Sequence, residues 1–503
     1  MDLTFATANS GELAWTAMKW ILHLAAFLMV VFHCLANRKE PAPTVAWIFV
    51  AWLFPVLGPL AYLAFGIDRV PYKGFEKHLA DQKLLAERKA RERHSLPLAY
   101  WRSVHDALAT TAPSGAAQRL EKAMDFILPE YPLLGGNSIK PLVTGDEAFP
   151  AMLNAIRNAR HHIHLQTFMF KNDSSSREFL DAMAERARSG VRVRLLYDRF
   201  GSTYAVWSGL FRRYRRIPNF SIAGWTQANV LKRQFQINLR NHRKVLVVDG
   251  REAFCGGINI HDENLSANGS PPIRDYHFAL RGPIVQELQY SFLRDWHFIT
   301  DENPDAILTE QYFPRIEPEG SAMIRLINSG PSATEMEIIA DVFFLALALA
   351  ERRVIAVTPY FVPQRDLLHA FRAAALRGVD VRLVVPARNN HVYAGLAARA
   401  LYGDLLKAGV RVFERRPPFM HAKALLVDDT VAIVGTANMD ARSLRLNYET
   451  NLAVYDETFH RSMRSLAEAE MELSDEVNIE DWLSRPAKQR MIENLCYLMM
   501  PVL

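Results

Sequence analysis

Residues 242–259, HRKVLVVDGREAFCGGIN, and residues 421–438, HAKALLVDDTVAIVGTAN, carry the pattern that decides the fold. Each stretch opens with His-x-Lys, runs through four apolar residues to an Asp, and closes on a glycine-containing turn that ends in Asn. In both, seven positions separate the Asp from the first glycine of the turn. The apolar runs are typical of buried β-strands. One such match would carry little weight, but two matches indicate a duplicated unit.

The surrounding chain repeats as well. Residues 189–195, SGVRVRL, are echoed by residues 377–383, RGVDVRL, at an offset of 188 positions. Strand-like runs alternate with amphipathic helical stretches, which indicates an α/β fold. We therefore predict two tandem domains, each a β-sheet flanked by helices, over residues 136–315 and 316–503. Prolines and glycines between 310 and 330 mark the boundary, and the second domain ends in an apolar tail.

Two uncharged runs, Trp20–Ala36 and Thr44–Ile67, precede the body. A helix needs about 20 apolar residues to cross a bilayer. The second run meets that length, and the first meets it if Lys19 extends to the interface. The sequence thus predicts a two-helix transmembrane hairpin over residues 1–70, with its turn at 37–41. A cleaved signal peptide followed by a core helix, and a re-entrant hairpin kinked by Pro55 and its neighbours, are the alternatives.

Residues 71–135 are expected to form a charged helical connector whose basic residues lie on a solvated helix face or on anionic headgroups. More cations follow the second apolar run than lie in the turn, which favours a multi-pass protein whose main body lies in the cytoplasm. The net charge of +5 and a pI of about 9 suit a partner that carries phosphate but do not separate lipid from nucleic acid. Three scattered cysteines give no disulfide framework.

The spacing within each motif has a physical logic. His and Lys two residues apart on a strand point to the same face, so both can reach one phosphate. The glycine turn lets backbone approach the ligand closely, and the Asn adds an amide donor. The Asp lies past the strand end, where it need not touch the phosphate and is available to orient a histidine.

These residues resemble the paired HKD motifs of the phospholipase D superfamily, over residues from about 142 to 503. Finer matches resemble the bacterial cardiolipin synthases: RNHRK at 240–244, TPYFVP at 358–363, NMDARSLRLNYE at 438–449 and the N-terminal hairpin with YLAFG at 62–66. The chain departs from the family at Gly257, where Ser or Thr is common. The missing hydroxyl donor predicts that the two half-sites are unequal.

The resemblance implies two-step covalent catalysis, with one histidine forming a phosphohistidine and the other acting as acid and base. By analogy His242 is the expected nucleophile and His421 the acid/base, although the sequence is nearly symmetric on this point. Asp275 and Glu449 are expected to orient the histidines, with surface carboxylates as the alternative interpretation. The expected catalytic set is His242, Lys244, Asp249, His421, Lys423 and Asp428, and the expected phosphate-binding residues are Asn259, Asn438 and Thr436. No metal and no cofactor is expected, because the lysines supply the positive charge.

Three functions are compatible with this sequence. The first is a cardiolipin synthase that joins two phosphatidylglycerols and releases glycerol, with other anionic phospholipids and the membrane as partners. The second is phospholipase D hydrolysis or another phosphatidyl transfer such as phosphatidylserine synthesis. The third is a nucleic-acid phosphodiesterase, which the membrane hairpin disfavours, so no nucleic-acid partner is expected. The acceptor and the oligomeric state stay open.

Overall fold

The computed structural model describes residues 10–37, 41–66, 70–94, 107, 115–225, 239–266, 270–331 and 335–499. They fall into two compact units, Met1–Pro71 and Tyr72–Leu503. The predicted turn at 38–40, the connector at 95–106 and 108–114, and the tail at 500–503 lie outside the described residues.

The first unit is helical. Helix α1 (Ser10–Ala36) is followed by α2 (Pro41–Leu53), α3 (Leu57–Ala61) and a π-helical turn, η1 (Tyr62–Gly66). Within α1, residues Ala14–Ala36 are long and apolar enough to cross a membrane. Buried residues of α1 and α2 pack against Tyr62, whose hydroxyl lies 2.7 Å from His33 Nδ1.

The prediction that the run from Thr44 to Ile67 forms one transmembrane helix is wrong. Helix α2 ends at Leu53, two residues before Pro55, and α3 begins at Leu57. Proline has no backbone N–H to donate within a helix, and its ring clashes with the preceding turn. At 13 residues α2 is about 20 Å long, which is shorter than the hydrocarbon core. A two-helix hairpin is therefore not established.

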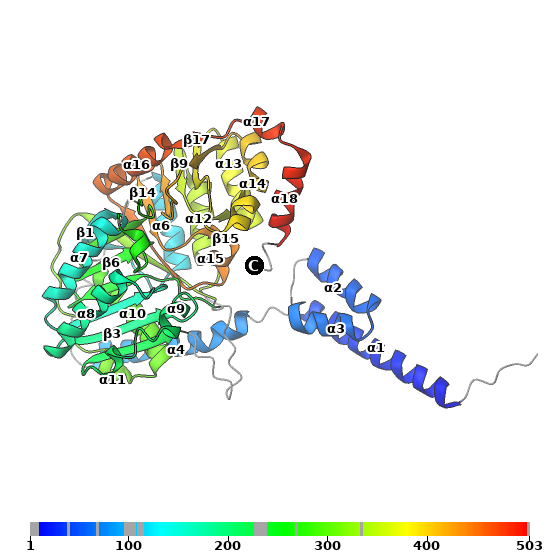
Figure 1. Ribbon diagram of the computed structural model, residues 1–503, viewed down its shortest axis with the longest axis horizontal. Helices are drawn as coiled ribbons and strands as arrows, with labels where there is room; N and C mark the ends of the chain where they lie inside the picture. Colours follow the sequence, from blue (N-terminus) through cyan, green and yellow to red (C-terminus); the bar gives the residue numbers. More distant parts are fainter. Residues whose placement is uncertain are drawn as a thin grey trace, which may run out of the picture. The chain divides into compact units, whose positions relative to one another are not determined.

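The second unit is built on one continuous sheet of 15 strands (Figure 1). The strand order is β17-β12-β11-β9-β13-β14-β16-β8-β1-β7-β6-β5-β2-β3-β4. The first-half strands are β1 (Leu134–Val143), β2 (His162–Thr167), β3 (Arg192–Asp198), β4 (Phe220–Trp225), β5 (Val245–Val248), β6 (Glu252–Gly256) and β7 (Tyr276–Arg281). The second-half strands are β8 (Ala322–Ser329), β9 (Arg353–Val357), β11 (Asp380–Pro386), β12 (Arg411–Arg415), β13 (Ala424–Val427), β14 (Val431–Gly435), β16 (Glu449–Tyr455) and β17 (Ser474–Glu476).

The order of the strands in the sheet follows the sequence repeat. Reading outward from the centre, β1-β7-β6-β5-β2-β3-β4 has the same order and directions as β8-β16-β14-β13-β9-β11-β12. The halves meet where β1 pairs antiparallel with β8. Because both halves share one sheet in one compact unit, the bounds 136–315 and 316–503 stay a prediction.

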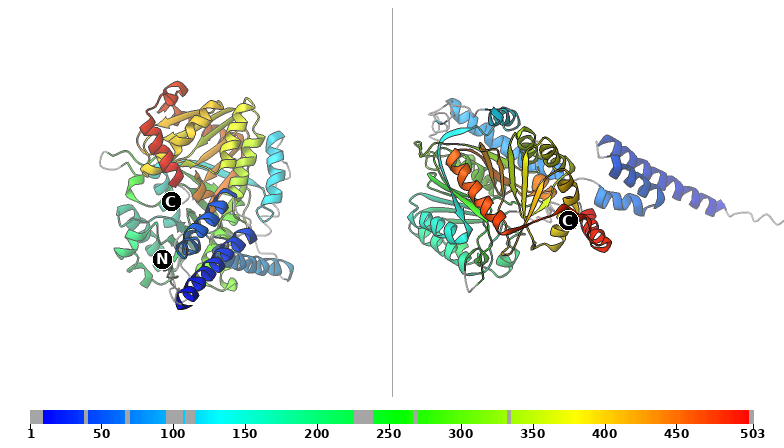
Figure 2. Two further views of the ribbon diagram at one scale, coloured as in Figure 1. Left: turned by 90° about the vertical axis from the view of Figure 1, so that its right-hand side faces the viewer. Right: turned by 90° about the horizontal axis from the view of Figure 1, so that it is seen from above.

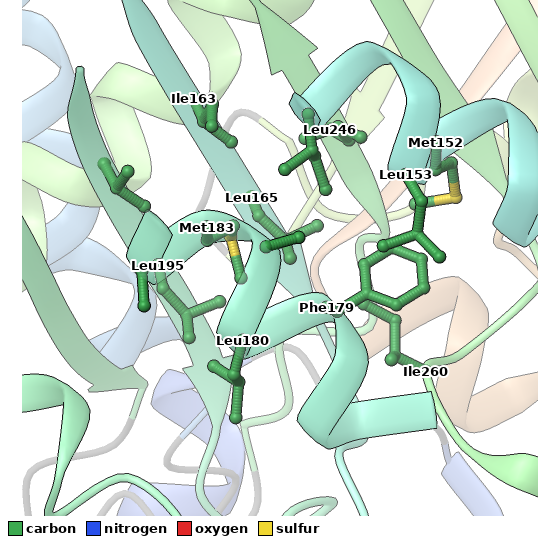
Figure 3. Packing of buried hydrophobic residues seen from close by; sticks show 14 of the residues in the cluster. Met152, Leu153, Ile163, Leu165, Phe179, Leu180, Met183, Leu195, Leu246 and Ile260 are labelled. Carbon is green, nitrogen blue, oxygen red and sulfur yellow. The ribbon is translucent and has the colours of Figure 1, made fainter. Parts of the chain in front are cut away.

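Helices cover both faces of this sheet (Figure 2). In the first half, α7 (Thr144–Asn158) and α8 (Ser174–Arg188) place Met152, Phe179 and Met183 against β2, β3 and β5 (Figure 3). These apolar positions recur every three to four residues along the helices, which makes one face of each hydrophobic. The other helices are α9 (Thr203–Trp207), η2 (Tyr214–Arg216), η4 (Asp262–Asn264), α10 (Ile284–Thr300), α11 (Pro304–Ile307), α12 (Ile338–Leu349), α13 (Arg365–Leu376), α14 (Val392–Lys407), α15 (Ala441–Arg445), α16 (Glu457–Glu472), α17 (Ile479–Leu483) and α18 (Ala487–Met499). A short parallel pair, β10 (Phe361–Val362) with β15 (Met439–Asp440), stands apart from the main sheet.

Helix α4 (Val70–His94) and α6 (Gly115–Ile127) belong to the predicted connector. Part of α4 is not a solvated face, because Lys77 is buried with its Nζ 2.7 Å from Asp81 Oδ2 and 3.1 Å from Asp295 Oδ1. Asp295 also binds Arg243 Nη1 at 2.8 Å, and Arg294 binds Asp81 and Glu335. We call this set the α4 ion cluster: Lys77, Asp81, Arg243, Arg294, Asp295 and Glu335. Its three cations balance its three anions, as burial requires.

Candidate active site

Both His-Lys pairs lie at the N-terminal ends of interior strands of the sheet, on the side where segments of the two halves contact each other. We call this line of strand ends the active-site edge of the sheet. His242 and Lys244 precede β5, and His421 and Lys423 precede β13. The pairs thus sit in extended segments that lead into the strands, rather than on the strands. Backbone bonds hold each segment to the other half: His242 N donates to Tyr448 O at 2.9 Å, and His421 N donates to Arg274 O at 2.7 Å.

Each motif histidine contacts a carboxylate that belongs to the other half of the sheet. His242 Nδ1 lies 3.0 Å from Glu449 Oε2, and His421 Nδ1 lies 2.7 Å from Asp275 Oδ2. Asp275 belongs to the first half and Glu449 to the second, so each ring is oriented by a carboxylate from the opposite half. A carboxylate at Nδ1 fixes the tautomer and leaves Nε2 to face a substrate.

Burial lowers the pKa of both histidine rings. It lowers the pKa of His421 to about 3, with the neighbouring Lys423 acting in the same direction and Asp275 opposing it. It also lowers the pKa of His242, against the pull of Glu449. Both rings are therefore neutral at pH 7. A neutral ring whose Nδ1–H is donated to a carboxylate presents a lone pair at Nε2, which is what a nucleophile needs.

The two lysines are buried beside the rings. Lys244 Nζ donates to the carbonyl of His242 at 2.7 Å, and Lys423 Nζ donates to the carbonyl of His421 and lies 4.0 Å from Asp275 Oδ2. Burial lowers the pKa of Lys244 to about 7 and the pKa of Lys423 to about 8. An anionic phosphate between them would restore full protonation, because a nearby opposite charge favours the charged form.

Asn259 and Asn438 follow the two glycine turns and are buried. Among the described residues, neither side-chain Oδ1 has a hydrogen-bond partner. A buried amide without a protein partner is costly unless a ligand or water satisfies it. An amide oxygen accepts hydrogen bonds, as phosphate oxygens do, so the phosphate-binding role of Asn259 and Asn438, which would use their Nδ2 donors, stays a prediction.

Thr436 does not fit its expected phosphate-binding role. Its hydroxyl donates to Glu449 Oε2 at 2.6 Å and accepts from Thr450 N at 2.9 Å. Ser443 and Asn447 donate to the other oxygen of Glu449, at 2.5 and 3.1 Å. Thr436 therefore belongs to the set of donors that fixes the carboxylate behind His242.

Gly257, at the position equivalent to Thr436, makes the second carboxylate site different. A Cβ added at Gly257 would lie 2.2 Å from Asp275 Oδ1. The shorter Asp275 side chain fills the space that a Thr side chain would need, and its Oδ1 accepts from Tyr276 N at 2.8 Å. Among the described residues, three side chains besides His242 donate hydrogen bonds to Glu449, whereas Asp275 accepts one from a backbone amide besides its contact with His421, and Lys423 lies 4.0 Å away.

The expectation that Asp249 and Asp428 act in catalysis by orienting the histidines is wrong. Asp249 accepts hydrogen bonds from the backbone amides of residues 160–162, at 2.7–3.0 Å. Asp428 accepts from the amides of residues 351–353 in the same way. Each Asp adopts a positive φ at the end of its strand, 53° and 52°, and caps the start of the neighbouring strand β2 or β9. Their role is to join two strands of the sheet.

Two comparisons with known proteins identify the family of this chain. The family model "Cardiolipin synthase, PLD-like domain" matches residues 152–296 and 345–471, and "Phospholipase_D-nuclease N-terminal" matches residues 24–66. The cardiolipin synthase of Geobacillus kaustophilus is 34% identical over 476 residues, 93% of this chain and 90% of the relative. This chain belongs to the cardiolipin synthase family. The major cardiolipin synthase of Bacillus subtilis is 31% identical, over 96% of this chain and 98% of that protein.

The fold of this cardiolipin synthase family member also resembles a solved structure. The phosphatidylserine synthase of Haemophilus influenzae covers 76% of this chain and 97% of its own, with a TM-score of 0.58 and 16% identity. That likeness concerns the fold. The family assignment rests on the sequence relatives and makes the chain a phosphatidyltransferase of the phospholipase D superfamily, with phospholipid substrates.

The sequence did not reveal the α4 ion cluster, nor that each histidine contacts a carboxylate of the other half. Arg243 stands between His242 and Lys244, and its Nε donates to the carbonyl of Glu449 at 3.2 Å. The equivalent residue in the second motif is Ala422, so this difference was visible in the sequence. Asp295, the partner of Arg243, was visible in the sequence only as one of three charged residues in the stretch 284–300.

Proposed function

We propose that this chain is a cardiolipin synthase that transfers a phosphatidyl group from one phosphatidylglycerol to a second, releasing glycerol. The observation that carries the proposal is the pair of buried histidines, each oriented at Nδ1 by a carboxylate of the opposite half. Two such rings in one site supply a nucleophile and a separate acid/base. The family assignment supports the choice of phosphatidylglycerol.

In the proposed first step, His242 Nε2 attacks the phosphorus of one phosphatidylglycerol. The P–O bond to glycerol breaks, and His421 protonates the departing oxygen. The more fully bound carboxylate, Glu449, favours His242 as the nucleophile, because it holds the ring while the covalent intermediate forms. The anionic phosphodiester offsets the burial of His421 and lets that ring carry the proton.

In the second step, His421 takes the proton from the headgroup hydroxyl of the second phosphatidylglycerol. The oxygen attacks phosphorus, and the P–N bond to His242 breaks. Lys244, Lys423 and the two buried asparagines balance the charge on the non-bridging oxygens. Protons and bonds balance over the cycle, so the protein ends as it began.

Phosphatidylglycerol as the sole lipid is expected to give cardiolipin and glycerol, with phosphatidic acid as a minor product. The measurement is product analysis by mass spectrometry after incubation of the full chain in bilayers. Because the covalent intermediate makes the exchange reversible, added glycerol should reduce net cardiolipin. Dominant phosphatidic acid would indicate a phospholipase D, and a requirement for a different lipid or for serine would indicate another phosphatidyl transfer.

We further propose that the first unit makes two passes, with α1 crossing the bilayer of the bacterial inner membrane and residues 41–66 returning as a broken second pass. The body then lies in the cytoplasm. Arg69, Lys73 and Lys83 on the body side outnumber Arg38 and Lys39 in the turn. Lys77 does not count toward this comparison, because it is buried in the α4 ion cluster.

The orientation predicts that a cysteine introduced at Ala42 reacts with an impermeant thiol reagent in intact cells. A cysteine at Leu376, which is exposed on the body, should react only after the cells are opened. The background is a chain with its native cysteines replaced. Reaction at position 376 but not at 42 in intact cells would reverse the proposed orientation.

A further inference from the structure

Exposed aromatic residues follow the strand β3 that leads to the first half-site. Tyr204 and Trp207 of α9 are 68% and 83% exposed, and Phe200 is exposed beside them. Arg240 Cζ lies 3.5 Å from the centre of the Phe200 ring, and Arg240 is two residues from His242. Large aromatic side chains held in water at this site require a reason, since their burial is favourable.

The second half carries exposed side chains in the equivalent place. Val392 and Tyr393 begin α14, which follows β11, and both are exposed. Ring contacts run from Tyr393 to His391, from His391 to Tyr360, and from Tyr360 to His421, with centroids 5.7, 5.7 and 6.3 Å apart. The exposed residues therefore adjoin both catalytic histidines.

The sheet topology places both groups at the same edge. Strand β2 is parallel to β3 and antiparallel to β5, so the end of β3 lies beside the start of β5, where His242 enters. Strand β9 has the same relation to β11 and β13, beside His421. At this edge Asn241 N donates to Asp198 Oδ2, the last residue of β3, at 2.9 Å.

Helix α18 buries Glu493 and exposes apolar side chains, together with the polar Lys488, Arg490 and Asn494. Glu493 is 1% exposed and binds Arg399 and Arg485 at 3.3 and 2.7 Å, whereas Leu498 is 73% exposed. Met491, Leu495 and Leu498 recur at i, i+4 and i+7 on the outer face. A helix on a water-soluble surface has the reverse arrangement.

Helix α18 extends this apolar surface. Arg490 lines a cavity with Gly403, and Glu493 binds Arg399, so α18 runs back along α14 toward Val392. In Figure 1 its C-terminal end lies on the same side of the second unit as α9 and α15. We call the combined surface the apolar rim: Phe200, Tyr204, Trp207, Val392, Tyr393, Met491, Leu495 and Leu498.

The charge around the apolar rim is positive. The stretches 199–207, 388–393 and 484–499 contain five Lys or Arg and one acidic residue, Glu493. That one carboxylate is buried and paired. Trp and Tyr are enriched at membrane–water interfaces, and basic residues near them attract anionic lipids.

We propose that the apolar rim is a membrane-contact surface of the catalytic unit, which seats the active-site edge on an anionic bilayer. This contact would act in addition to helix α1, which is proposed to cross the membrane. The proposal rests on the proposed function in one respect, that a bilayer is the source of both lipids. Seated in this way, the edge carrying both histidines faces the headgroup layer. A lipid then reaches the histidines without leaving the bilayer.

Lipid quenching tests this contact. Single cysteines at Trp207, Leu498 and Leu376 are labelled with a fluorophore in a chain whose native cysteines are replaced. The full chain is reconstituted in vesicles of phosphatidylglycerol and brominated phosphatidylcholine in equal parts. Leu376 is the matched control, because it is apolar and exposed but ends α13 at the opposite edge of the sheet. Brominated chains should quench at 207 and 498 but not at 376.

The outcomes separate this proposal from the proposed function. No quenching at 207 and 498, or equal quenching at all three positions, overturns the membrane contact even if cardiolipin forms normally. Quenching confined to 207 and 498 supports it, whichever lipid product the protein makes. The readout does not depend on turnover.

A paired substitution, Tyr204→Ser with Trp207→Ser, provides the second measurement. Turnover on bilayers should fall about fivefold, while turnover of dispersed short-chain phosphatidylglycerol should stay unchanged. Leu376→Ser should change neither rate. An equal loss on both substrates would place these residues in folding or catalysis and would contradict the contact, as would an unchanged rate on bilayers.

Discussion

His242→Ala and His421→Ala should each reduce turnover by about 10⁴-fold, because nucleophile and acid/base are separate tasks that one ring cannot perform alone. The double variant should be little worse than either single variant, since residues that act as a unit are not additive. The measurement is cardiolipin formation from phosphatidylglycerol in bilayers by the purified full chain.

The exposed His369 on α13 offers a matched control, and His369→Ala should retain normal turnover. Melting temperatures of the three variants should show that the fold is intact. Near-normal turnover in either His242→Ala or His421→Ala would rule out one site shared by both motifs.

Lys77→Met should lower both stability and turnover, although Lys77 lies far from the motifs in the sequence. The substitution leaves Asp295 with one cation fewer in a buried setting, and removing one partner of a buried ion pair costs about 3 kcal/mol. Asp295 holds Arg243 Nη1 at 2.8 Å and Asn241 Nδ2 at 3.0 Å, on either side of His242. The expected result is a lower unfolding midpoint, together with a kcat loss that exceeds any change in KM.

Lys83→Met serves as the control, because Lys83 is exposed on the same helix. Pairing Lys77→Met with Asp295→Asn should destabilise less than the sum of the two single changes, since the double variant removes both charges. Simple additivity would show that the two residues are not coupled. An unchanged kcat in a folded Lys77→Met protein would separate the cluster from catalysis.

Much of the site can be predicted from the sequence, because the motif that forms it occurs twice in the chain. The duplicated His-x-Lys motifs, the apolar runs after them and the asparagines of the turns all depend on local spacing. Asp275 and Glu449 also follow the motifs at similar distances. What spacing alone cannot reveal is which histidine each carboxylate meets, because that depends on how the two halves pair across β1 and β8.

Each wrong prediction has an identifiable physical cause. Asp249 and Asp428 are acidic and belong to the motif, yet their position after a strand puts their oxygens within reach of three successive backbone amides at the start of the neighbouring strand. The apolar run from Thr44 has the composition of a membrane helix, but hydropathy does not register the break that Pro55 imposes. Lys77 resembled a solvated cation because Asp295, the partner that places it in the buried cluster, lies more than 200 residues away in the sequence.

The inequality of Gly257 and Thr436 has a consequence for how such a protein can evolve. In a dimer of identical chains, every substitution appears on both sides of the symmetry axis, so both histidines must share one environment. Once both copies lie in a single chain, each side can drift separately. One copy has a hydroxyl and a long carboxylate, and the other has a glycine and a short one. Because the two copies lie in one chain, the two half-sites can divide the work unequally, which a symmetric dimer does not allow.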